Sequence, residues 1–467
     1  SLISGALQCD CAVCCRRENE PPLIKGWIPF LGKALEFRKD SLKFLLEQKR
    51  KHGDIFTVRM AGKDVTFVMD SSLYPYIIKH GRQLDFHKFS DKVSPATFGY
   101  QPVHSKLHPG LKEQIHRSFK LLQGDNLTPL TESMMGNLML VGCMYQFCLS
   151  VMFEATLLTL FGRPAAARRR TGTNALMDDF VKFDNKFPHL ITEVPIWLLG
   201  GTRAVRQKLI NYFLPDRMSH LTNMSEFIRM RMEINNTLSP LSAYHFAMLW
   251  AALGNTVPAT FWAMYYLVSH PEALQVVRQE IQEVLSLSGV EFSSDTNVKL
   301  HREQLDKLRC LESAIKESLR LSSASLNVRM ALEDFSLRLG ESRSFAIRKG
   351  DAIAMYPRTT HLDPEIYEEP KFRFDRYVHN GAEKTDFYKD DQKLKYYLIP
   401  FGSGVSMCPG RHFAINEIKQ FLSLLLLYFD LQLEDGQSRA EFDPSRSGVG
   451  ILPPSADVRF RYRLRVV

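Results

Sequence analysis

The chain has 467 residues, of which 45% are hydrophobic and 24% are charged. This composition is typical of a globular protein and excludes a disordered or fibrous chain. The formal charge of +9 favours contact with an anionic membrane surface or an acidic partner. The basic residues are dispersed and no nucleic-acid-binding motif accompanies them, so we expect no nucleic-acid partner.

The N-terminal segment predicts a membrane anchor that is degenerate or truncated. Residues 2–15 are mildly apolar but too short to cross a bilayer, which takes roughly 18 to 20 apolar residues. Arg16 and Arg17, followed by Glu20, Pro21 and Pro22, are typical of the basic stop and proline-rich hinge after such an anchor. We therefore assign residues 1–20 to an anchor region and 21–467 to one folded domain; a soluble protein is the alternative.

Four of the eight cysteines lie between residues 9 and 15 and the others are scattered. This distribution does not predict a disulfide framework and points to a reducing, cytosol-facing environment.

The predicted elements are mainly helices. Residues 41–51 predict an amphipathic helix, and residues 54–60 and 63–69 alternate around Ala61 and Gly62 as a β-hairpin. Residues 74–285 are helical by period, and strands return at 333–339, 346–348 and 351–355. Because these strands come from distant segments, we expect a mainly α fold with a small β-rich region (α+β), folded as one unit.

An apolar helical run over residues 243–268 contains Asn255, Thr256 and Pro258. A proline inside a helix removes one backbone hydrogen bond and frees a carbonyl one turn earlier, here near Gly254. The pattern predicts an opened turn beside a hydroxyl, which is suited to holding water or an oxygen ligand. The alternative is an ordinary kink whose polar groups are satisfied internally.

A helix over residues 311–321 places Glu317 and Arg320 three residues apart on one face. Alone, such a pair is weak evidence, because exposed pairs of this kind contribute only about 0.3–0.5 kcal/mol. A second arginine, Arg376, follows in the segment 374–377.

The strongest signal is the glycine-rich loop of residues 401–410, which includes Phe401, Gly404, Cys408 and Gly410. We expect Gly402, Gly404 and Gly410 to permit positive φ angles. The apolar periodicity that follows places Cys408 just before a helix N-terminus, where N–H groups and the helix dipole favour a thiolate. The alternative is a buried structural cysteine beside a turn.

Phe401, Gly404, Cys408 and Gly410 stand at the spacing of the haem-binding loop of the cytochrome P450 superfamily, which this chain resembles. The resemblance implies the P450 fold and haem b, with the Cys408 thiolate as the axial ligand of the iron. It also implies that Thr256 and Asn255 serve oxygen protonation and substrate placement. Glu317, Arg320 and Arg376 would form a structural ion-pair network behind the haem.

Arg329 matches the family position where an arginine contacts a haem propionate. Two departures weaken the pattern: Ser406 replaces the usual basic residue two places before the cysteine, and Arg117 is a poor substitute for the usual Trp-x-x-x-Arg. The sequence is also short near residues 136–143, where relatives have a longer helical connection.

The Asn-Thr-x-Pro sequence at residues 255–258 resembles the sterol 7α-hydroxylase branch, as do residues 320–327, 361–367, 394–397 and 450–454. The resemblance implies a monooxygenase that inserts one oxygen atom of O2 at the 7α position of a sterol, cholesterol before an oxysterol. It also implies an NADPH–cytochrome P450 reductase as partner and location at the endoplasmic reticulum membrane, facing the cytosol. We expect Leu326 and Val328 in the pocket wall. A haem-thiolate isomerase such as prostacyclin synthase, and a haem protein without turnover, are the alternatives.

Overall fold

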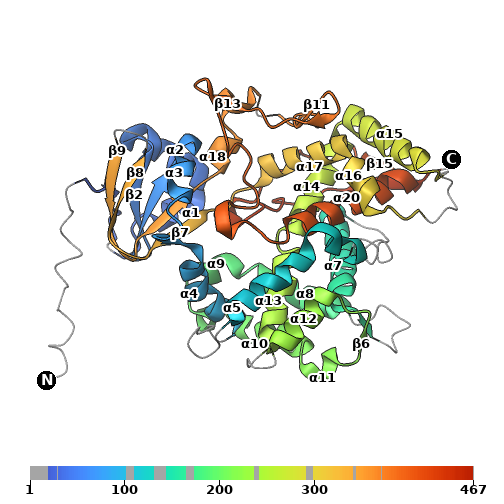
Figure 1. Ribbon diagram of the computed structural model, residues 1–467, viewed down its shortest axis with the longest axis horizontal. Coiled ribbons are helices and arrows are strands. Elements are labelled where there is room, and N and C mark those ends of the chain that lie inside the picture. Colours follow the sequence, from blue (N-terminus) through green and yellow to red (C-terminus); the bar gives the residue numbers. More distant parts are fainter. Residues whose placement is uncertain are drawn as a thin grey trace.

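A computed structural model describes residues 19–28, 30–100, 110–130, 143–164, 173–235, 241–290, 298–339, 343–369 and 371–465. Figure 1 shows a sheet-rich part at the left and a helix-rich part over the rest of the molecule, as the mainly α prediction requires. The predicted anchor region lies outside the described residues except for Asn19 and Glu20.

The larger helices are α2 (Ser41–His52), α4 (Phe86–Phe98), α5 (Leu111–Ser118), α7 (Met144–Phe161), α8 (Thr173–Asp184), α10 (Thr202–Tyr212), α12 (Glu226–Asn235), α13 (Leu241–Leu253), α14 (Thr256–Ser269), α15 (Pro271–Leu287), α17 (Arg309–Ser322) and α20 (Arg411–Tyr428). The shorter ones are α1 (Ala34–Lys39), α3 (Tyr74–Ile78), α9 (Phe187–Ile191), α11 (Pro215–Met218), α16 (Arg302–Lys307), α18 (Arg358–His361) and α19 (Pro364–Tyr367).

The longer strands are β2 (Ile55–Met60), β3 (Lys63–Val68), β7 (Asn327–Ala331), β8 (Phe335–Leu339), β9 (Arg343–Ile347), β10 (Ala352–Met355), β15 (Phe429–Leu433) and β16 (Phe460–Leu464). The two-residue strands are β1 (Leu23–Ile24), β4 (Leu84–Asp85), β5 (Arg163–Pro164), β6 (Leu221–Thr222), β11 (Val378–His379), β12 (Ala382–Glu383), β13 (Tyr388–Lys389) and β14 (Gln392–Lys393).

One six-stranded sheet joins both halves of the sequence, in the order β1-β2-β3-β10-β7-β4. The predicted hairpin of β2 and β3 is confirmed, and it turns at Ala61 and Gly62, both of which have positive φ. β10 lies parallel to β3 and antiparallel to β7. β7 was not predicted as a strand, because its half-buried residues do not alternate cleanly; its place in the sheet comes from pairing with distant segments.

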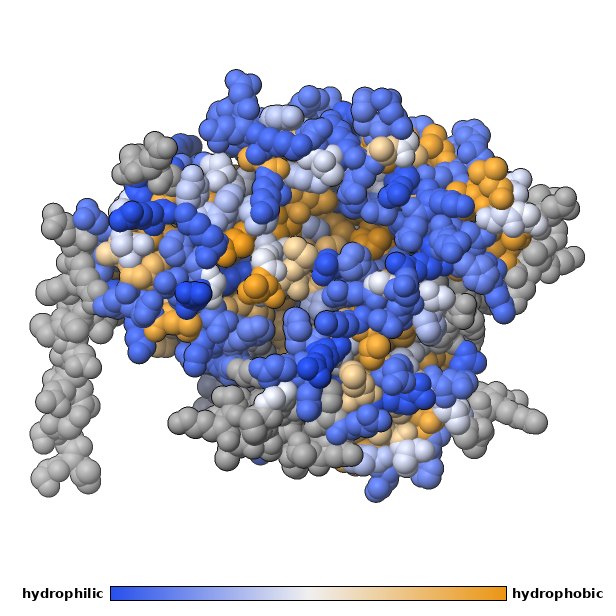
Figure 2. Space-filling view, in the orientation of Figure 1, coloured by the Kyte–Doolittle hydropathy of each residue, from blue (hydrophilic) through white to orange (hydrophobic). Residues whose placement is uncertain are grey.

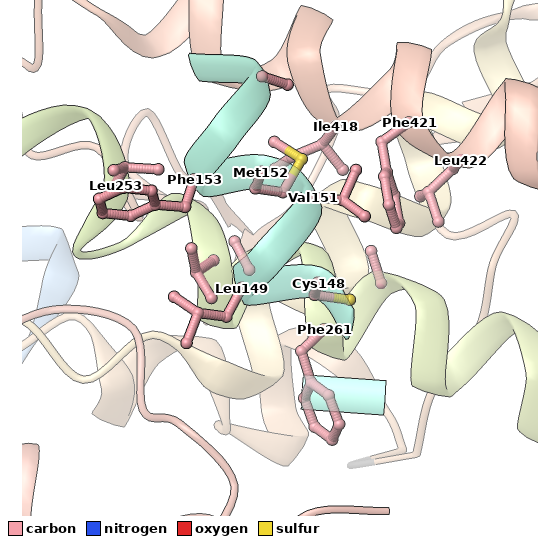
Figure 3. Packing of buried hydrophobic residues seen from close by; sticks show 14 of the residues in the cluster. Cys148, Leu149, Val151, Met152, Phe153, Leu253, Phe261, Ile418, Phe421 and Leu422 are labelled. Carbon is pink, nitrogen blue, oxygen red and sulfur yellow. The ribbon is translucent and has the colours of Figure 1, made fainter. Parts of the chain in front are cut away.

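The hydrophobic core lies where α7, α14, α17 and α20 pack together. Figure 3 shows Val151 and Met152 of α7 facing Ile418, Phe421 and Leu422 of α20. α7 is long and apolar enough to cross a membrane, but 72% of it is buried inside the protein. We therefore interpret α7 as a core helix.

The long helical run predicted over residues 243–268 is divided in two. α13 ends at Leu253 and α14 begins at Thr256, with Gly254 and Asn255 in a turn between them. Pro258 accounts for the break, since it has no N–H to donate to the carbonyl of Gly254.

Candidate functional site

The cysteine loop crosses the centre of the molecule between the sheet and α20 (Figure 1). The Cys408 N–H donates to the carbonyl of Phe401 at 2.8 Å, which closes the loop. Gly402 and Gly404 have φ values of 75° and 66°, so each needs the freedom of glycine. Gly410 does not: its φ is −86°, and it caps α20 instead. The prediction of a positive φ at Gly410 is therefore wrong.

Cys408 lies three residues before the start of α20, as the apolar periodicity predicted. Part of the residue is open to solvent. Desolvation nevertheless raises the pKa of the Cys408 thiol, although the N–H groups of Gly410 and Arg411 and the charge of Arg411 act to lower it. The N–H groups at the helix start therefore favour the thiolate as predicted, while desolvation of the sulfur atom outweighs them in the net shift of the pKa.

A buried ion-pair network joins α17 to the chain segment from His361 to Arg376. Arg320 makes two bonds of 2.8 Å to the two carboxylate oxygens of Glu317, a bidentate pair. Arg376 Nε donates to Glu317 Oε1 at 2.9 Å. Burial lowers the pKa of Arg320 and the Glu317 charge raises it, with a net rise. The structure thus brings together the three residues named from the sequence, and both arginines also donate to backbone carbonyls of the 361–371 region.

Asn255 and Thr256 lie at the break between α13 and α14, and they contact different neighbours. Thr256 is buried, and its carbonyl accepts a bond from Thr260 Oγ1 at 2.8 Å. Asn255 is half-buried, and its Oδ1 accepts the N–H of Ile451 at 2.9 Å. The acceptor of Asn255 is therefore engaged by the protein itself, which leaves its amide nitrogen as the group able to meet a ligand.

Residues 448–452, here called the C-terminal ribbon, run beside residues 322–326. Four backbone hydrogen bonds of 2.7 to 3.1 Å join the two segments. Two side chains hold the ribbon. Asn255, in the turn before α14, accepts the N–H of Ile451, and Trp262 Nε1 of α14 donates to the carbonyl of Leu452 at 2.6 Å. Gly450 fits only because it has no side chain, since a Cβ there would lie 2.0 Å from Asn255 Oδ1.

Comparison with known proteins identifies the family. The family model described as Cytochrome P450 matches residues 88–460. The chain belongs to the cytochrome P450 family. It is 44% identical to "Cytochrome P450 7A1" of Oryctolagus cuniculus over 96% of this chain and 94% of that protein.

Two further relatives carry descriptive names. The chain is 42% identical to "Cholesterol 7-alpha-monooxygenase" of Cricetulus griseus, over 100% of this chain and 99% of that protein. It is 40% identical to "25-hydroxycholesterol 7-alpha-hydroxylase" of Rattus norvegicus, over 84% of this chain and 98% of that protein. The sterol 7α-hydroxylase branch predicted from residues 255–258 agrees with these relatives.

Membership in the P450 family implies a haem whose iron is bound by a cysteine thiolate, and the residues present fit such a group. Cys408 would supply the thiolate, from a loop in which Gly402 and Gly404 have positive φ angles. Arg329 is 7% exposed, yet within the described chain it donates only to the carbonyls of Val328 and Ser403 and makes no ion pair. Burial lowers the pKa of Arg329, and the charge of Asp85 acts to raise it. A buried cation that makes no ion pair among the described residues, and that adjoins the cysteine loop, suits a haem carboxylate.

The buried arginine near α5 is not the one that the sequence suggested. Arg117 of α5 is exposed. The buried cation of this region is Arg231 of α12, which is 3% exposed, donates to Ser118 Oγ at 3.3 Å and lies over the rings of Phe119 and Phe227. Burial lowers the pKa of Arg231 to about 10. Sequence reasoning missed Arg231 because α12 carries several charged residues and only tertiary packing distinguishes them.

Two predictions remain, one on Ser406 and one on residues 136–143. Ser406, which stands where relatives have a basic residue, donates to the carbonyl of Ser403 at 3.4 Å. The short region at residues 136–143 lies outside the described residues except for Cys143.

Proposed function

We propose that this P450 is a haem-thiolate monooxygenase that hydroxylates a sterol at the 7α position, with cholesterol as the first choice of substrate. The observation that carries the proposal is Cys408, held before α20 by the bond to Phe401, in a chain more than 40% identical over its whole length to a cholesterol 7α-monooxygenase. The reaction consumes O2, NADPH, a proton and the sterol, and it yields the 7α-alcohol, water and NADP⁺.

The proposed cofactor is haem b. When bound, it supplies the redox chemistry that activates O2, and a cysteine thiolate is the axial ligand that favours O–O cleavage. Cys408 would ligate the iron, and Arg329 would pair with a propionate. Phe401, Gly404 and Gly410 would shape the loop around the thiolate.

Asn255 and Thr256 are proposed to serve proton delivery and substrate placement from the opened turn before α14. The amide nitrogen of Asn255 is available to donate to a substrate hydroxyl or to a water molecule. Thr256 is buried whereas Asn255 is half-buried, so we assign Asn255 the contact with ligand and Thr256 a supporting part. Leu326 and Val328 are proposed wall residues; both pack, half-buried, against the cluster that contains Leu452 of the ribbon.

An apolar surface is available for the sterol and for a membrane. Figure 2 shows hydrophobic side chains gathered in a central depression of one face. Elsewhere Trp27, Phe30 and Trp197 are at least 70% exposed. Lys63, at the tip of the hairpin near Phe30, pairs with Glu193 at 2.8 Å, four residues before Trp197. These exposed aromatic residues support contact with a membrane surface, because tryptophan favours the interface.

We further propose location at the endoplasmic reticulum membrane with the catalytic domain, residues 21–467, facing the cytosol. Electrons would come from an NADPH–cytochrome P450 reductase that approaches the surface near the thiolate, where Arg411 lies three residues after Cys408. The net positive charge of the chain favours an acidic redox partner.

Incubation of the purified holoenzyme with reductase, NADPH and cholesterol tests the proposal, with 7α-hydroxycholesterol measured by mass spectrometry. We expect product only when NADPH is present. Parallel incubation with 25-hydroxycholesterol decides between cholesterol and an oxysterol by the ratio of kcat/KM. Turnover of a prostaglandin endoperoxide without NADPH would instead assign the chain as an isomerase. Haem incorporation with no product from any substrate would contradict an enzymatic function.

A further inference from the structure

A carboxylate at the end of α8 binds two segments that lie far away in the sequence. Asp184 is the last residue of α8. Trp250 Nε1 of α13 donates to Asp184 Oδ1 at 2.8 Å. Arg446, just before the C-terminal ribbon, donates to Asp184 Oδ2 at 2.6 Å and to Oδ1 at 3.1 Å. One carboxylate therefore joins α8, α13 and the segment that leads into the ribbon.

The ion pair between Asp184 and Arg446 is largely removed from solvent. The Arg446 side chain is 8% exposed and the Asp184 side chain is 16% exposed. Arg446 Nη1 also donates to the backbone carbonyl of Asp184 at 3.2 Å, one of the carbonyls that the end of a helix leaves without an intrahelical partner. A bidentate arginine–carboxylate pair has a fixed geometry, so this contact holds its two segments in a defined place.

The ring of Trp250 is held at three points. It stacks on Phe187, with 3.8 Å between the ring centroids and 20° between the planes. It also lies against Gly254, where an added Cβ would be 3.1 Å from Trp250 Cε2. Asp184 holds the N–H group. Because Gly254 and Asn255 form the opened turn before α14, the position of this ring bears on that turn.

The other partner, Arg446, leads into the C-terminal ribbon. Its carbonyl accepts the N–H of Val449 at 3.0 Å. Two residues later, the N–H of Ile451 donates to Asn255 Oδ1. The ribbon is therefore fixed at its start through Asp184 and farther along by Asn255, the residue to which the proposed function gives the contact with ligand.

We propose that Asp184 is a positioning residue, which sets the place of Trp250 and of the ribbon relative to the opened turn where the sterol is oriented. Asp184 acts through Trp250 and Arg446. This inference rests on the proposed function, because its consequence is the position of hydroxylation. When the carboxylate is removed, Asn255 and the ribbon no longer hold one arrangement, and the sterol is oxidised at positions other than 7α.

The functional test measures the share of the 7α-alcohol among all hydroxysterols, at equal haem content and with sterol binding followed by spectral titration. We expect Asp184→Ala to lower this share and to weaken sterol binding, each several-fold. A purely structural role would reduce the yield of haem-loaded protein but would leave the product distribution of the loaded fraction unchanged. An unchanged distribution would therefore overturn the proposal.

Conservative variants separate the two partners of Asp184. Asp184→Asn keeps an oxygen that can accept the Trp250 N–H but removes the anion that pairs with Arg446, so its loss of the 7α share should be smaller than that of Asp184→Ala. Arg446→Met should add no further loss in the Asp184→Ala protein, because its partner is already absent. Equal losses in Asp184→Asn and Asp184→Ala would exclude the part assigned to Trp250, and a further loss with Arg446→Met would exclude the part assigned to the ion pair.

A second test does not need turnover. In thermal unfolding of the holoenzyme, the midpoint temperature of the Asp184→Ala, Arg446→Met double variant should fall by less than the sum of the two single changes, because both remove one interaction. Strictly additive losses would show that Asp184 does not hold Arg446.

Asp179→Ala is the matched control. Asp179 also belongs to α8 and its side chain is 17% exposed, but it pairs with Lys182 of the same helix, at 3.6 Å. Its removal should leave the product distribution and the sterol affinity at their wild-type values, and a change as large as that of Asp184→Ala would contradict the proposal. If the wild type makes no 7α-hydroxysterol, the proposed function fails, whereas the coupling in thermal unfolding still decides whether Asp184 holds Arg446.

Discussion

Gly450→Ala is the substitution for which the structure gives the sharpest expectation. The added Cβ would lie 2.0 Å from Asn255 Oδ1 and 2.9 Å from its Cγ, so either Asn255 or the C-terminal ribbon must move. Overpacking of this kind costs about 1–3 kcal/mol. Loss of the bond from the Ile451 N–H to Asn255 adds about 0.5–1.5 kcal/mol. We expect a total loss of about 1.5–4.5 kcal/mol in the free energy of unfolding.

The assay is thermal unfolding of the holoenzyme together with a spectral titration of sterol binding. Gly450→Ala should lower the midpoint temperature by a few degrees and weaken sterol binding, because the ribbon packs against the predicted pocket wall at Leu326. Gly81→Ala is the matched control, since a Cβ at Gly81 meets nothing within 4 Å.

A double variant distinguishes the clash from other causes. Asn255→Ala removes the atom that the new methyl meets, so the combination with Gly450→Ala should cost less than the sum of the two single changes. Strictly additive losses, or a Gly450→Ala protein as stable as the Gly81→Ala control, would refute the role assigned to Asn255 in holding the ribbon.

Three other predictions follow from the described contacts. Glu317→Gln should destabilise the fold by about 3–5 kcal/mol, because it leaves Arg320 and Arg376 buried without their anion. Glu365 pairs with Lys389 at 3.1 Å but its own side chain is 65% exposed, so Glu365→Gln should cost under about 1 kcal/mol. Denaturant unfolding compares the two variants, and equal costs would contradict a buried network. Arg329→Leu should lower haem retention after gel filtration while Arg117→Leu does not; similar retention in both would contradict a propionate contact for Arg329. Burial acts to raise the pKa of Glu312, but Lys419 and Lys316 lower it to about 2, below its usual 4.5. The stability that Glu312 contributes is therefore present above pH 4.5 and is lost as the pH falls toward 2. In acid unfolding, Glu312→Gln should lose less stability than the wild type over this pH window, and an equal loss in both proteins would refute the assignment.

Patterns that depend on local chemistry were predictable from the sequence. The β2–β3 hairpin followed from alternation around Ala61 and Gly62, and the start of α20 followed from apolar spacing after Cys408. The break at Gly254 and Asn255 followed from Pro258. In each case the physical cause lies within a few residues of its effect.

Features set by tertiary packing were not predictable. β7 is a strand because β10 and β4 pair with it from distant parts of the chain. Glu417 looks like any charged residue in a helix until α7 and α14 bury it. The net rise in the pKa of the Cys408 thiol likewise comes from desolvation by the surrounding protein, whereas the helix dipole and its N–H groups are local to the loop.

The central claim is that Cys408 is the axial ligand of a haem iron, and the carbon monoxide difference spectrum of the reduced protein tests it most directly. The Soret band should be that of thiolate-ligated haem in the wild type and in Cys310→Ala, a control at the N-terminal end of α17, and it should be absent in Cys408→Ala. A thiolate-type band that survives in Cys408→Ala, or a wild-type band typical of a neutral ligand, would contradict the assignment.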